Sequence, residues 1–278
     1  MDERLTIVKG FYRESCEDTR LERSRHGQLE FATTMEYIRR YAKPGAKVIE
    51  LGAGTGRYSV TLAKQGFDVT AVELVEENLV VLRANAAAAG AEVAKEAAAG
   101  AEARGVSLQA IQGDATDLSG FGDEAFDVTL SFGPMYHLYE PAEVRKAIRE
   151  AIRVTRKGGV LLFAFLSVYA IFFDNYLRDT LQAGIEENFD ENYRTKHFAE
   201  QLFTGYDIKE FEELFTEEPV EHCATVAANT VMELAEGRED FSMSDEDFAA
   251  FFRYHLATCE KRELLGASSH LLYICRKL

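Results

Sequence analysis

The middle of the chain alternates between short apolar segments and stretches with helical spacing, and this alternation restricts the fold more than any other feature. Five segments rich in β-branched or other apolar residues follow one another with helical stretches between them. They are residues 47–51, 67–72, 107–112, 126–130 and 160–165. Strands that alternate with helices form mostly parallel sheets with helices on both faces. The sequence therefore predicts an α/β fold.

The helix before the fifth segment and the region after it have their own signals. A helix that begins at Pro141 is expected to end at Gly158-Gly159, because proline is tolerated in a first helical turn and glycine ends helices. The apolar run from Val160 to Phe173 is too short to span a bilayer. It indicates a buried strand followed by a covered loop.

The end of the chain breaks this pattern. Two further strand-like segments, Val220–Ala227 and Ser268–Arg276, flank a stretch in which Ser244 and Asp247 predict the start of a helix by a capping box. The segment that begins at His270 is apolar enough to be an internal strand. The helix carries an aromatic and aliphatic stripe that we interpret as core rather than as a cofactor site. The stripe consists of Phe248, Phe251, Phe252 and Leu256.

A glycine-rich loop follows the first predicted strand, with the sequence Gly52-Ala53-Gly54-Thr55-Gly56. Glycine lets a backbone approach a ligand closely, and the free N–H groups at a helix start favour a nucleotide or a carboxylate. A dinucleotide fingerprint would require glycine or alanine at position 57, where the chain has Arg57. The loop therefore favours a ligand other than a dinucleotide pyrophosphate.

Carboxylates stand at the ends of the next two predicted strands. Glu73 follows Gly52 by 21 positions, the spacing at which an acidic residue accepts ribose hydroxyls in dinucleotide sites. An exposed charge that begins a helix is the structural alternative for Glu73. Asp114 ends the third strand, where its carboxylate can reach an adenine amino group. The carboxyl ends of parallel strands meet at one edge of the sheet, where ligands bind.

The segment from Pro44 to Leu166, together with the last two strands, resembles the class I S-adenosylmethionine-dependent methyltransferases. Five segments in order carry the resemblance: VIELGAGTGRYS from Val48, VTAVE ending at Glu73, IQGDATDL from Ile111, FDVTLSFGPMYHL from Phe126 and AIRVTRKGGVLLFAF from Ala151. The resemblance implies S-adenosylmethionine as cofactor. It also implies a Rossmann-like sheet of seven strands, mostly parallel with an antiparallel last strand.

The same resemblance implies roles for individual residues. Gly52, Gly54 and Gly56 would face the methionine part of the cofactor. Glu73 would bind the ribose and Asp114 the adenine, while Glu50 would lie near the amino-acid end. Ala115 and Ser131, at the ends of the third and fourth strands, complete the cofactor candidates.

The fourth-strand motif narrows the reaction. Enzymes that methylate exocyclic amino groups of nucleic-acid bases share an [Asp/Asn]-Pro-Pro-[Tyr/Phe] element, which this chain lacks. The sequence from Gly133 to Leu138, Gly-Pro-Met-Tyr-His-Leu, is instead similar to bacterial methyltransferases that act mostly on small or poorly defined substrates. Glu17–Leu21 and Ser24–Gly27 resemble the amino-terminal element of such proteins, which folds over the cofactor.

The domain organisation follows from these matches. We expect an amino-terminal helical cap over residues 1–43 and a methyltransferase domain over residues 44–278. Insertions are expected at about residues 84–104, 168–204 and 232–263, the second of them as a lid over the carboxyl edge of the sheet. The alanine-rich stretch 84–103 has almost nothing to bury, which predicts an exposed helical extension or a disordered bulge.

Methyl transfer is an in-line displacement, so alignment supplies much of the catalysis and a base helps if the acceptor carries a proton. His137 is the first candidate for that base because imidazole accepts a proton near neutral pH. The alternative is a hydrogen-bonded structural histidine. Tyr12, His26, Tyr136 and Tyr139 are candidates for the substrate pocket, whereas we expect His222, His255 and His270 to be structural.

Charge limits the partners. The chain has 31 Lys and Arg against 47 Asp and Glu, a net charge of −16, which disfavours nucleic acid and anionic membranes and favours a small-molecule substrate. Residues 1–43 lack this acidic excess. Their arginines form either a solvated helix face or a site for an anionic group: Arg13, Arg20, Arg23 and Arg25.

The four cysteines are scattered without a CxxC pair, so neither a zinc site nor a thioredoxin motif is visible, and no metal is expected. The start of the chain has no signal pattern, which predicts a cytoplasmic protein. Two other functions stay open. One is a cofactor-binding sensor without catalysis, because no residue is an unambiguous base, and the other is methylation of a protein or structured RNA through the amino-terminal arginines. The sequence does not indicate an oligomeric state.

Overall fold

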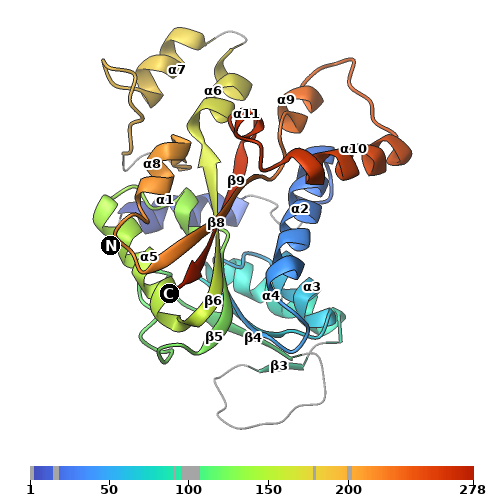
Figure 1. Ribbon diagram of the computed structural model, residues 1–278, viewed down its shortest axis with the longest axis vertical. Coiled ribbons are helices and arrows are strands. Elements are labelled where there is room, and N and C mark those ends of the chain that lie inside the picture. Colours follow the sequence, from blue (N-terminus) through green and yellow to red (C-terminus); the bar gives the residue numbers. More distant parts are fainter. Residues whose placement is uncertain (1–2, 15–18, 91, 95–106, 178–179, 199–201) are drawn as a thin grey trace.

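The computed structural model describes residues 3–14, 19–90, 92–94, 107–177, 180–198 and 202–278 (Figure 1). Cys16 and half of the alanine-rich stretch therefore lie outside the described residues, as do parts of the amino-terminal motif and of the expected lid. None of the described helices is long and apolar enough to cross a membrane.

A single mixed sheet forms the centre of the molecule (Figure 1). Its strands are β1 (Lys47–Leu51), β2 (Asp68–Glu73), β3 (Glu92–Ala94), β4 (Ser107–Gln112), β5 (Phe126–Ser131), β6 (Thr155–Ser167), β7 (Gly205–Tyr206), β8 (Val220–Ala227) and β9 (His270–Lys277). Their order is β3-β4-β2-β1-β5-β6-β9-β8, and the short β7 pairs with the end of β6.

The sheet confirms the predicted α/β class and its antiparallel last strand. Strands β4, β2, β1, β5 and β6 pair in parallel, and β9 inserts antiparallel between β6 and β8. Without the short β3 and β7 the sheet has the seven strands expected. The internal position of β9 explains its apolar sequence, since Leu271–Cys275 are buried from both faces.

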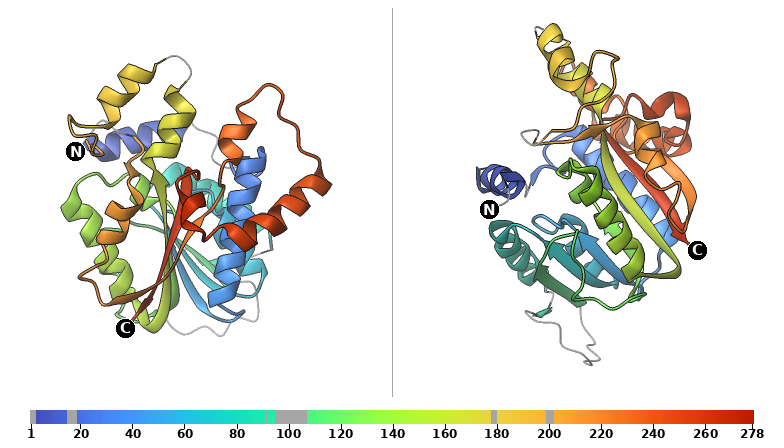
Figure 2. Two further views of the ribbon diagram at one scale, coloured as in Figure 1. Left: turned by 45° about the horizontal axis from the view of Figure 1, so that its top comes forward. Right: turned by 90° about the vertical axis from the view of Figure 1, so that its left-hand side faces the viewer.

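Helices flank the sheet on both sides (Figures 1 and 2). They are α1 (Glu3–Glu14), α2 (Arg25–Tyr41), α3 (Arg57–Lys64), α4 (Glu76–Ala88), the 3-10 turn η2 (Pro134–Tyr136), α5 (Pro141–Val154), α6 (Val168–Tyr176), α7 (Leu181–Asn188), α8 (Ile208–Glu213), α9 (Met232–Glu236), α10 (Asp245–Thr258) and α11 (Arg262–Leu265). Helix α4 covers the first part of the alanine-rich stretch.

Two predictions around β6 were wrong. Helix α5 ends at Val154, not at the glycine pair, because the Thr155 hydroxyl bonds the carbonyl of Ala151 and β6 begins there. Gly158, at φ +73°, instead lies where the register of β6 against β5 shifts. After β6 the apolar run continues as helix α6 rather than as a loop, because the Ser167 hydroxyl accepts the N–H of Ala170 and caps the helix.

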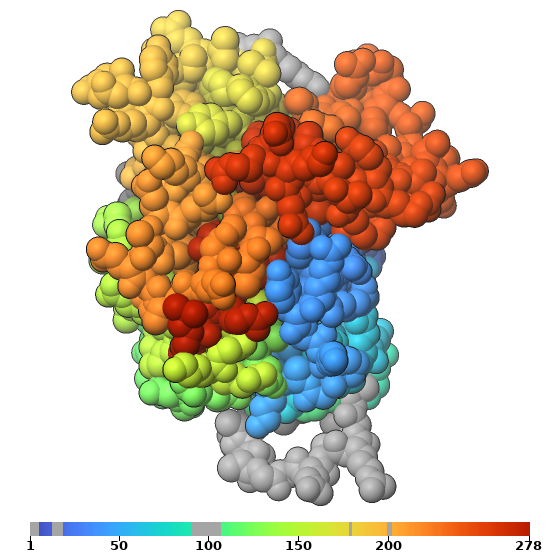
Figure 3. All heavy atoms as spheres, viewed as in Figure 1, coloured from blue at the N-terminus to red at the C-terminus, as the bar shows by residue number. Residues whose placement is uncertain are grey.

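The interpretation of the α10 stripe as core was also wrong. The predicted cap is present, since the Ser244 hydroxyl accepts the N–H of Asp247. The aromatic residues of the stripe are only half-buried, however, while His255 is buried. The reason is that α10 packs on the outside of α2 (Figure 3). The Arg25 guanidinium lies over the Phe248 ring, 5.1 Å from its centroid.

The elements outside the sheet gather at its carboxyl edge. Helices α6 and α7 project beyond β6 as an arm, and α1 lies between this arm and the rest of the domain, where it also contacts α4 (Figure 2). Helix α9 packs against α2 on the other side of the same edge. These four segments surround the place where the parallel strands end.

Candidate active site

The glycine loop after β1 packs closely against η2 and borders a cavity. Gly52 has φ +73°, and a Cβ atom there would lie 2.8 Å from Cδ of Pro134, so the loop can lie against η2 only as glycine. Gly54 has φ +55°, lines the cavity, and would direct a Cβ atom into open space. The first glycine serves packing, and the second leaves room for a ligand.

Glu73 holds this loop in place. One oxygen of its carboxylate accepts the backbone N–H of Gly54 at 2.7 Å, and the other accepts the N–H of Val75 at 2.9 Å. The side chain is buried, which raises the pKa of Glu73, while these bonds oppose the rise. Glu73 also lines the cavity, so the residue that anchors the loop can meet a ligand.

Glu50 lies deeper, on β1, with 1% of its surface exposed. Burial raises the pKa of Glu50 to about 8, and a hydrogen bond from the Ser59 hydroxyl opposes this shift. The carboxyl group is therefore mostly protonated at neutral pH. Because Glu50 also lines the cavity, a cation bound nearby would favour its ionised form.

The cavity at the carboxyl edge has a volume of about 620 Å³, within the range of small-molecule sites. One end is formed by the glycine loop, Glu73 and the Gly113–Ala115 turn, in which Asp114 accepts the N–H of Thr116 at 2.8 Å. The other end is formed by α1, η2, the arm α6–α7 and the start of β9, together with Phe198, Leu202 and Phe203. The cavity thus extends well beyond the loop and its carboxylates.

Tyr12 and His137 meet in the wall of this second end. The Tyr12 hydroxyl lies 2.9 Å from Nε2 of His137, and Nδ1 of His137 lies 2.8 Å from the carbonyl oxygen of Leu202. A carbonyl oxygen only accepts, so Nδ1 carries the hydrogen of the neutral ring and Nε2 accepts from Tyr12. The histidine is thereby fixed in one tautomer.

Aromatic rings enclose the same pair. Phe203 packs on His137 with ring centroids 5.3 Å apart, and Phe11 meets Phe203 edge-on at 5.3 Å. Helix α1, η2 and the segment around residue 203 are therefore joined through one histidine. This contact forms part of the cavity wall.

Comparison with known proteins agrees with this geometry. Residues 49–163 match the family model described as a methyltransferase domain. Over 152 residues the chain is 32% identical to a protein of Geobacillus sp. (strain WCH70) that also bears a methyltransferase name, with 54% of each chain covered. The chain spans about half the length of the curated relatives it matches.

Solved structures match over more of the chain. A protein of Pyrococcus horikoshii OT3 superposes with a TM-score of 0.58 at 19% identity and covers 97% of this chain and 99% of its own. A SAM-dependent methyltransferase of Methanosarcina mazei gives 0.54 at 16% identity, over 87% and 97% of the two chains. Residues 49–163 form a methyltransferase domain. The whole chain has the fold of the solved structures above, and the cofactor that such a domain implies is S-adenosylmethionine.

The residues of the methyltransferase domain fit this cofactor. Gly54 borders open space into which a Cβ atom would project, and the buried Glu73 offers a carboxylate beside it. Asp114 supplies a second carboxylate at the end of β4. Acceptors for ribose hydroxyls and an adenine amino group are therefore present along one wall.

Ten of the residues that we predict for the site line the cavity at the carboxyl edge of the sheet. They are Tyr12, His26, Glu50, Gly52, Gly54, Glu73, Asp114, Ala115, Tyr136 and His137. Gly56, Ser131 and Tyr139 are not among the described lining residues. Gly56 is instead required because a Cβ atom would lie 2.7 Å from Cγ of Leu82, and Ser131 is buried within β5.

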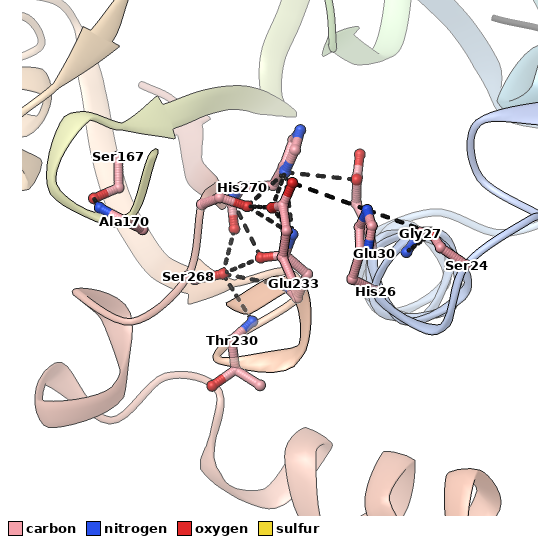
Figure 4. A network of polar contacts seen from close by, with 12 residues as sticks. Ser24, His26, Gly27, Glu30, Ser167, Ala170, Thr230, Glu233, Ser268 and His270 are labelled. Atoms are coloured by element: carbon pink, nitrogen blue, oxygen red, sulfur yellow. Dashed lines mark hydrogen bonds and ion pairs between the residues drawn. The ribbon is translucent and has the colours of Figure 1, made fainter. Parts of the chain in front are cut away.

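Sequence reasoning missed a polar network at the far end of the cavity (Figure 4). His270, which we expect to be structural, lines the cavity together with Ser269 and Glu233. The pairing of His270 with Leu166 brings the start of β9 to the carboxyl end of β6. Only the sheet register reveals this, because nothing in the local sequence of β9 resembles a binding motif.

Proposed function

We propose that the protein transfers the methyl group of S-adenosylmethionine to an oxygen or nitrogen atom of a small molecule. The observation that carries the proposal is the single cavity that joins the glycine loop and Glu73 at one end to the Tyr12–His137 pair at the other. One cavity can then hold a cofactor and an acceptor next to each other, as methyl transfer requires.

Residues at the first end would hold the cofactor. Glu73 would accept the ribose hydroxyls while it keeps Gly54 in place, and Asp114 would accept the adenine amino group. Glu50 and the glycine loop would face the amino-acid part, and Arg23, an exposed arginine in the cavity wall, would face its carboxylate. Bound S-adenosylmethionine supplies a methyl group on a cationic sulfur, which keeps the bonding electron pair when the acceptor's lone pair forms the new bond to carbon.

Residues at the second end would align the acceptor and take its proton. Nε2 of His137 accepts from the Tyr12 hydroxyl, so a proton that Tyr12 receives from an acceptor can be balanced by the proton that Tyr12 gives to His137. The Leu202 carbonyl keeps Nδ1 protonated and thereby keeps Nε2 available. His137 thus acts through Tyr12.

A small acceptor is supported by the enclosure of this end. This end is lined by Val8 and Tyr12 of α1, by residues of the arm, and by Phe198, Leu202 and Phe203. The net charge of −16 further disfavours a nucleic-acid substrate.

The proposal is tested by supplying S-adenosylmethionine together with either the small-molecule fraction or the macromolecular fraction of a bacterial extract. We expect S-adenosylhomocysteine to form with the small-molecule fraction. Formation only with the macromolecular fraction would identify a protein or RNA methyltransferase. Cofactor binding without product in either fraction would support a sensor and contradict the proposal.

A further inference from the structure

Glu233 of α9 presents a carboxylate at the far end of the cavity, held by its neighbours (Figure 4). The Ser269 hydroxyl donates to Oε2, and Nδ2 of Asn229 lies 3.3 Å from the same oxygen. The orientation of the Asn229 amide is fixed, because its Oδ1 accepts the backbone N–H of His270 at 3.3 Å. The carboxylate is therefore positioned before any ligand arrives.

No lysine or arginine within the described ranges forms an ion pair with Glu233. The nearest basic groups are His26, with Nε2 3.9 Å from Oε1, and His270, with Nδ1 4.0 Å from Oε2. Burial lowers the pKa of His270 below its usual value, so this ring is neutral at pH 7. Glu233 thus leaves a negative charge on the cavity wall that His270 does not balance.

The neighbouring carboxylates of Glu30 and Glu236 have partners within the protein. Arg20 forms a two-pronged ion pair with Glu30, with both N–O distances 2.9 Å. Glu236 accepts the backbone N–H groups of Arg25 and His26 at the start of α2. Glu233 differs from both because it lines the cavity.

Aromatic rings lie at the same end. Tyr136 meets His270 edge-on with centroids 6.0 Å apart, and Tyr136, Tyr12 and Phe203 all line the cavity. The faces of aromatic rings attract organic cations, and a nearby carboxylate adds a direct ion pair. An alkylammonium group combines both requirements in a small ligand.

We propose that Glu233 binds the cationic nitrogen of a small amine, so that the acceptor class of this methyltransferase is the amines. Before methyl transfer the bound ammonium gives one proton through Tyr12 to His137, which frees the nitrogen lone pair that forms the new bond to carbon. The inference rests on the proposed methyl transfer. The ammonium group of the cofactor's own amino-acid part has the same chemistry, and the experiment below separates it from an amine acceptor.

The test uses calorimetry on the full chain in three forms: wild type, Glu233→Gln and Glu187→Gln. Glutamine keeps the size and the accepting oxygen of Glu233 but removes the charge. Glu187 is the matched control because it also lines the cavity, but on the exposed face of α7, with the Tyr176 hydroxyl at 3.1 Å. Thermal unfolding confirms that each variant is folded.

S-adenosylhomocysteine, which retains the ammonium group, is titrated first. Protein saturated with it then receives sets of three compounds of equal shape: an amine, an alcohol and a carboxylate, such as phenethylamine, 2-phenylethanol and phenylacetate, with alkyl and naphthyl analogues. We expect at least one amine to bind the wild type more tightly than its matched alcohol and carboxylate. Glu233→Gln should lower the affinity for that amine by about 10- to 100-fold, and Glu187→Gln should lower it by less than about threefold.

Two further readings in Glu233→Gln support the proposal: unchanged affinity for S-adenosylhomocysteine and unchanged affinity for the alcohols. Loss of S-adenosylhomocysteine binding in this variant would overturn it, because Glu233 would then hold the cofactor. Absence of amine binding to a wild type that binds S-adenosylhomocysteine would also overturn it while leaving the cofactor site intact. A wild type that does not bind S-adenosylhomocysteine at all would instead contradict the methyl-transfer function itself.

Discussion

The hydroxyl of Tyr12 lies 2.9 Å from Nε2 of His137, although 125 positions separate the two residues in the chain. A third segment fixes the pair, because the carbonyl of Leu202 accepts from Nδ1 of the same ring. The amino-terminal helix, the turn after β5 and the segment after the arm therefore meet at one imidazole. Both the proposed proton route and this part of the cavity wall depend on this contact.

Removal of the Tyr12 hydroxyl should slow methyl transfer without lowering the affinity for the cofactor. We expect Tyr12→Phe to lower kcat by about 10²-fold, the scale of lost acid–base assistance, and to change the affinity for S-adenosylhomocysteine by less than about threefold. Steady-state kinetics and calorimetry measure the two effects, with Tyr254→Phe on the exposed face of α10 as the control. Wild-type kcat in Tyr12→Phe would exclude the tyrosine from the proton route.

Loss of the Glu73 carboxylate should weaken the binding of the cofactor. Glu73→Ala removes the acceptor proposed for the ribose and the anchor of Gly54, so we expect a loss of about 1.5–3 kcal/mol in S-adenosylmethionine binding. Calorimetry provides the measurement. Glu76→Ala, which changes an exposed residue at the start of α4, should leave the affinity as it is. Equal affinities in wild type and Glu73→Ala would contradict the assignment.

The buried Glu50 should make stability depend on pH in a defined direction. Its folded pKa of about 8 exceeds the ordinary 4.5, so the folded state holds a proton that the unfolded state releases between these values. The contribution of Glu50 to the free energy of unfolding therefore falls as pH rises from about 4.5 to 8.

The Glu50→Gln variant has no ionisable group at this position, so its free energy of unfolding does not fall for this reason as pH rises. Urea denaturation from pH 5 to pH 9 measures this difference. The free energy of unfolding of the variant, relative to that of wild type, should increase as pH rises and should stay constant above about pH 8. A difference that does not change over this range would mean that Glu50 has an ordinary pKa.

The Arg20–Glu30 ion pair should stabilise the amino-terminal region against the sheet. Arg20 holds the pKa of Glu30 at about 2 against the effect of burial, so the stabilisation is complete above about pH 4.5 and is lost as pH falls through 2. Either Glu30→Gln or Arg20→Met leaves one charge without its partner and should cost about 3 kcal/mol at pH 7. The double variant should cost less than the sum of the two, and strictly additive losses would show that the pair does not interact.

Much of the fold could be predicted because local pattern and tertiary position agree in the strands. The β-branched run Lys47–Leu51 is strand β1 as expected, and Val220–Ala227 is β8 with the same bounds. The errors arise where tertiary contacts decide. Thr155 ends α5 before its glycines because its hydroxyl also meets Thr129 on the neighbouring strand β5 at 2.6 Å. The α10 stripe is half-exposed because the helix packs on α2 rather than on the sheet.

The two ends of the cavity differ in how far sequence reveals them. Glu73 and Asp114 could be found because each follows a predicted strand, and strand ends converge in a parallel sheet. Glu233 lies in an insertion, and His270 begins an antiparallel strand, so neither has a motif or a fixed spacing. The role of the amino-terminal arginines could not be predicted from the sequence either. Arg20 lines the cavity but forms an ion pair with Glu30, and residue spacing alone does not predict this pair.

Electron density for S-adenosylhomocysteine in a crystal of the complex would test the central claim most directly. We predict the adenine beside Asp114, the ribose hydroxyls on Glu73 and the amino-acid part along Gly52–Gly54, with the sulfur facing Tyr12 and the unfilled end of the cavity toward Glu233. Density for the ligand outside this cavity, or with its sulfur turned away from Tyr12 and His137, would contradict the proposed site and mechanism.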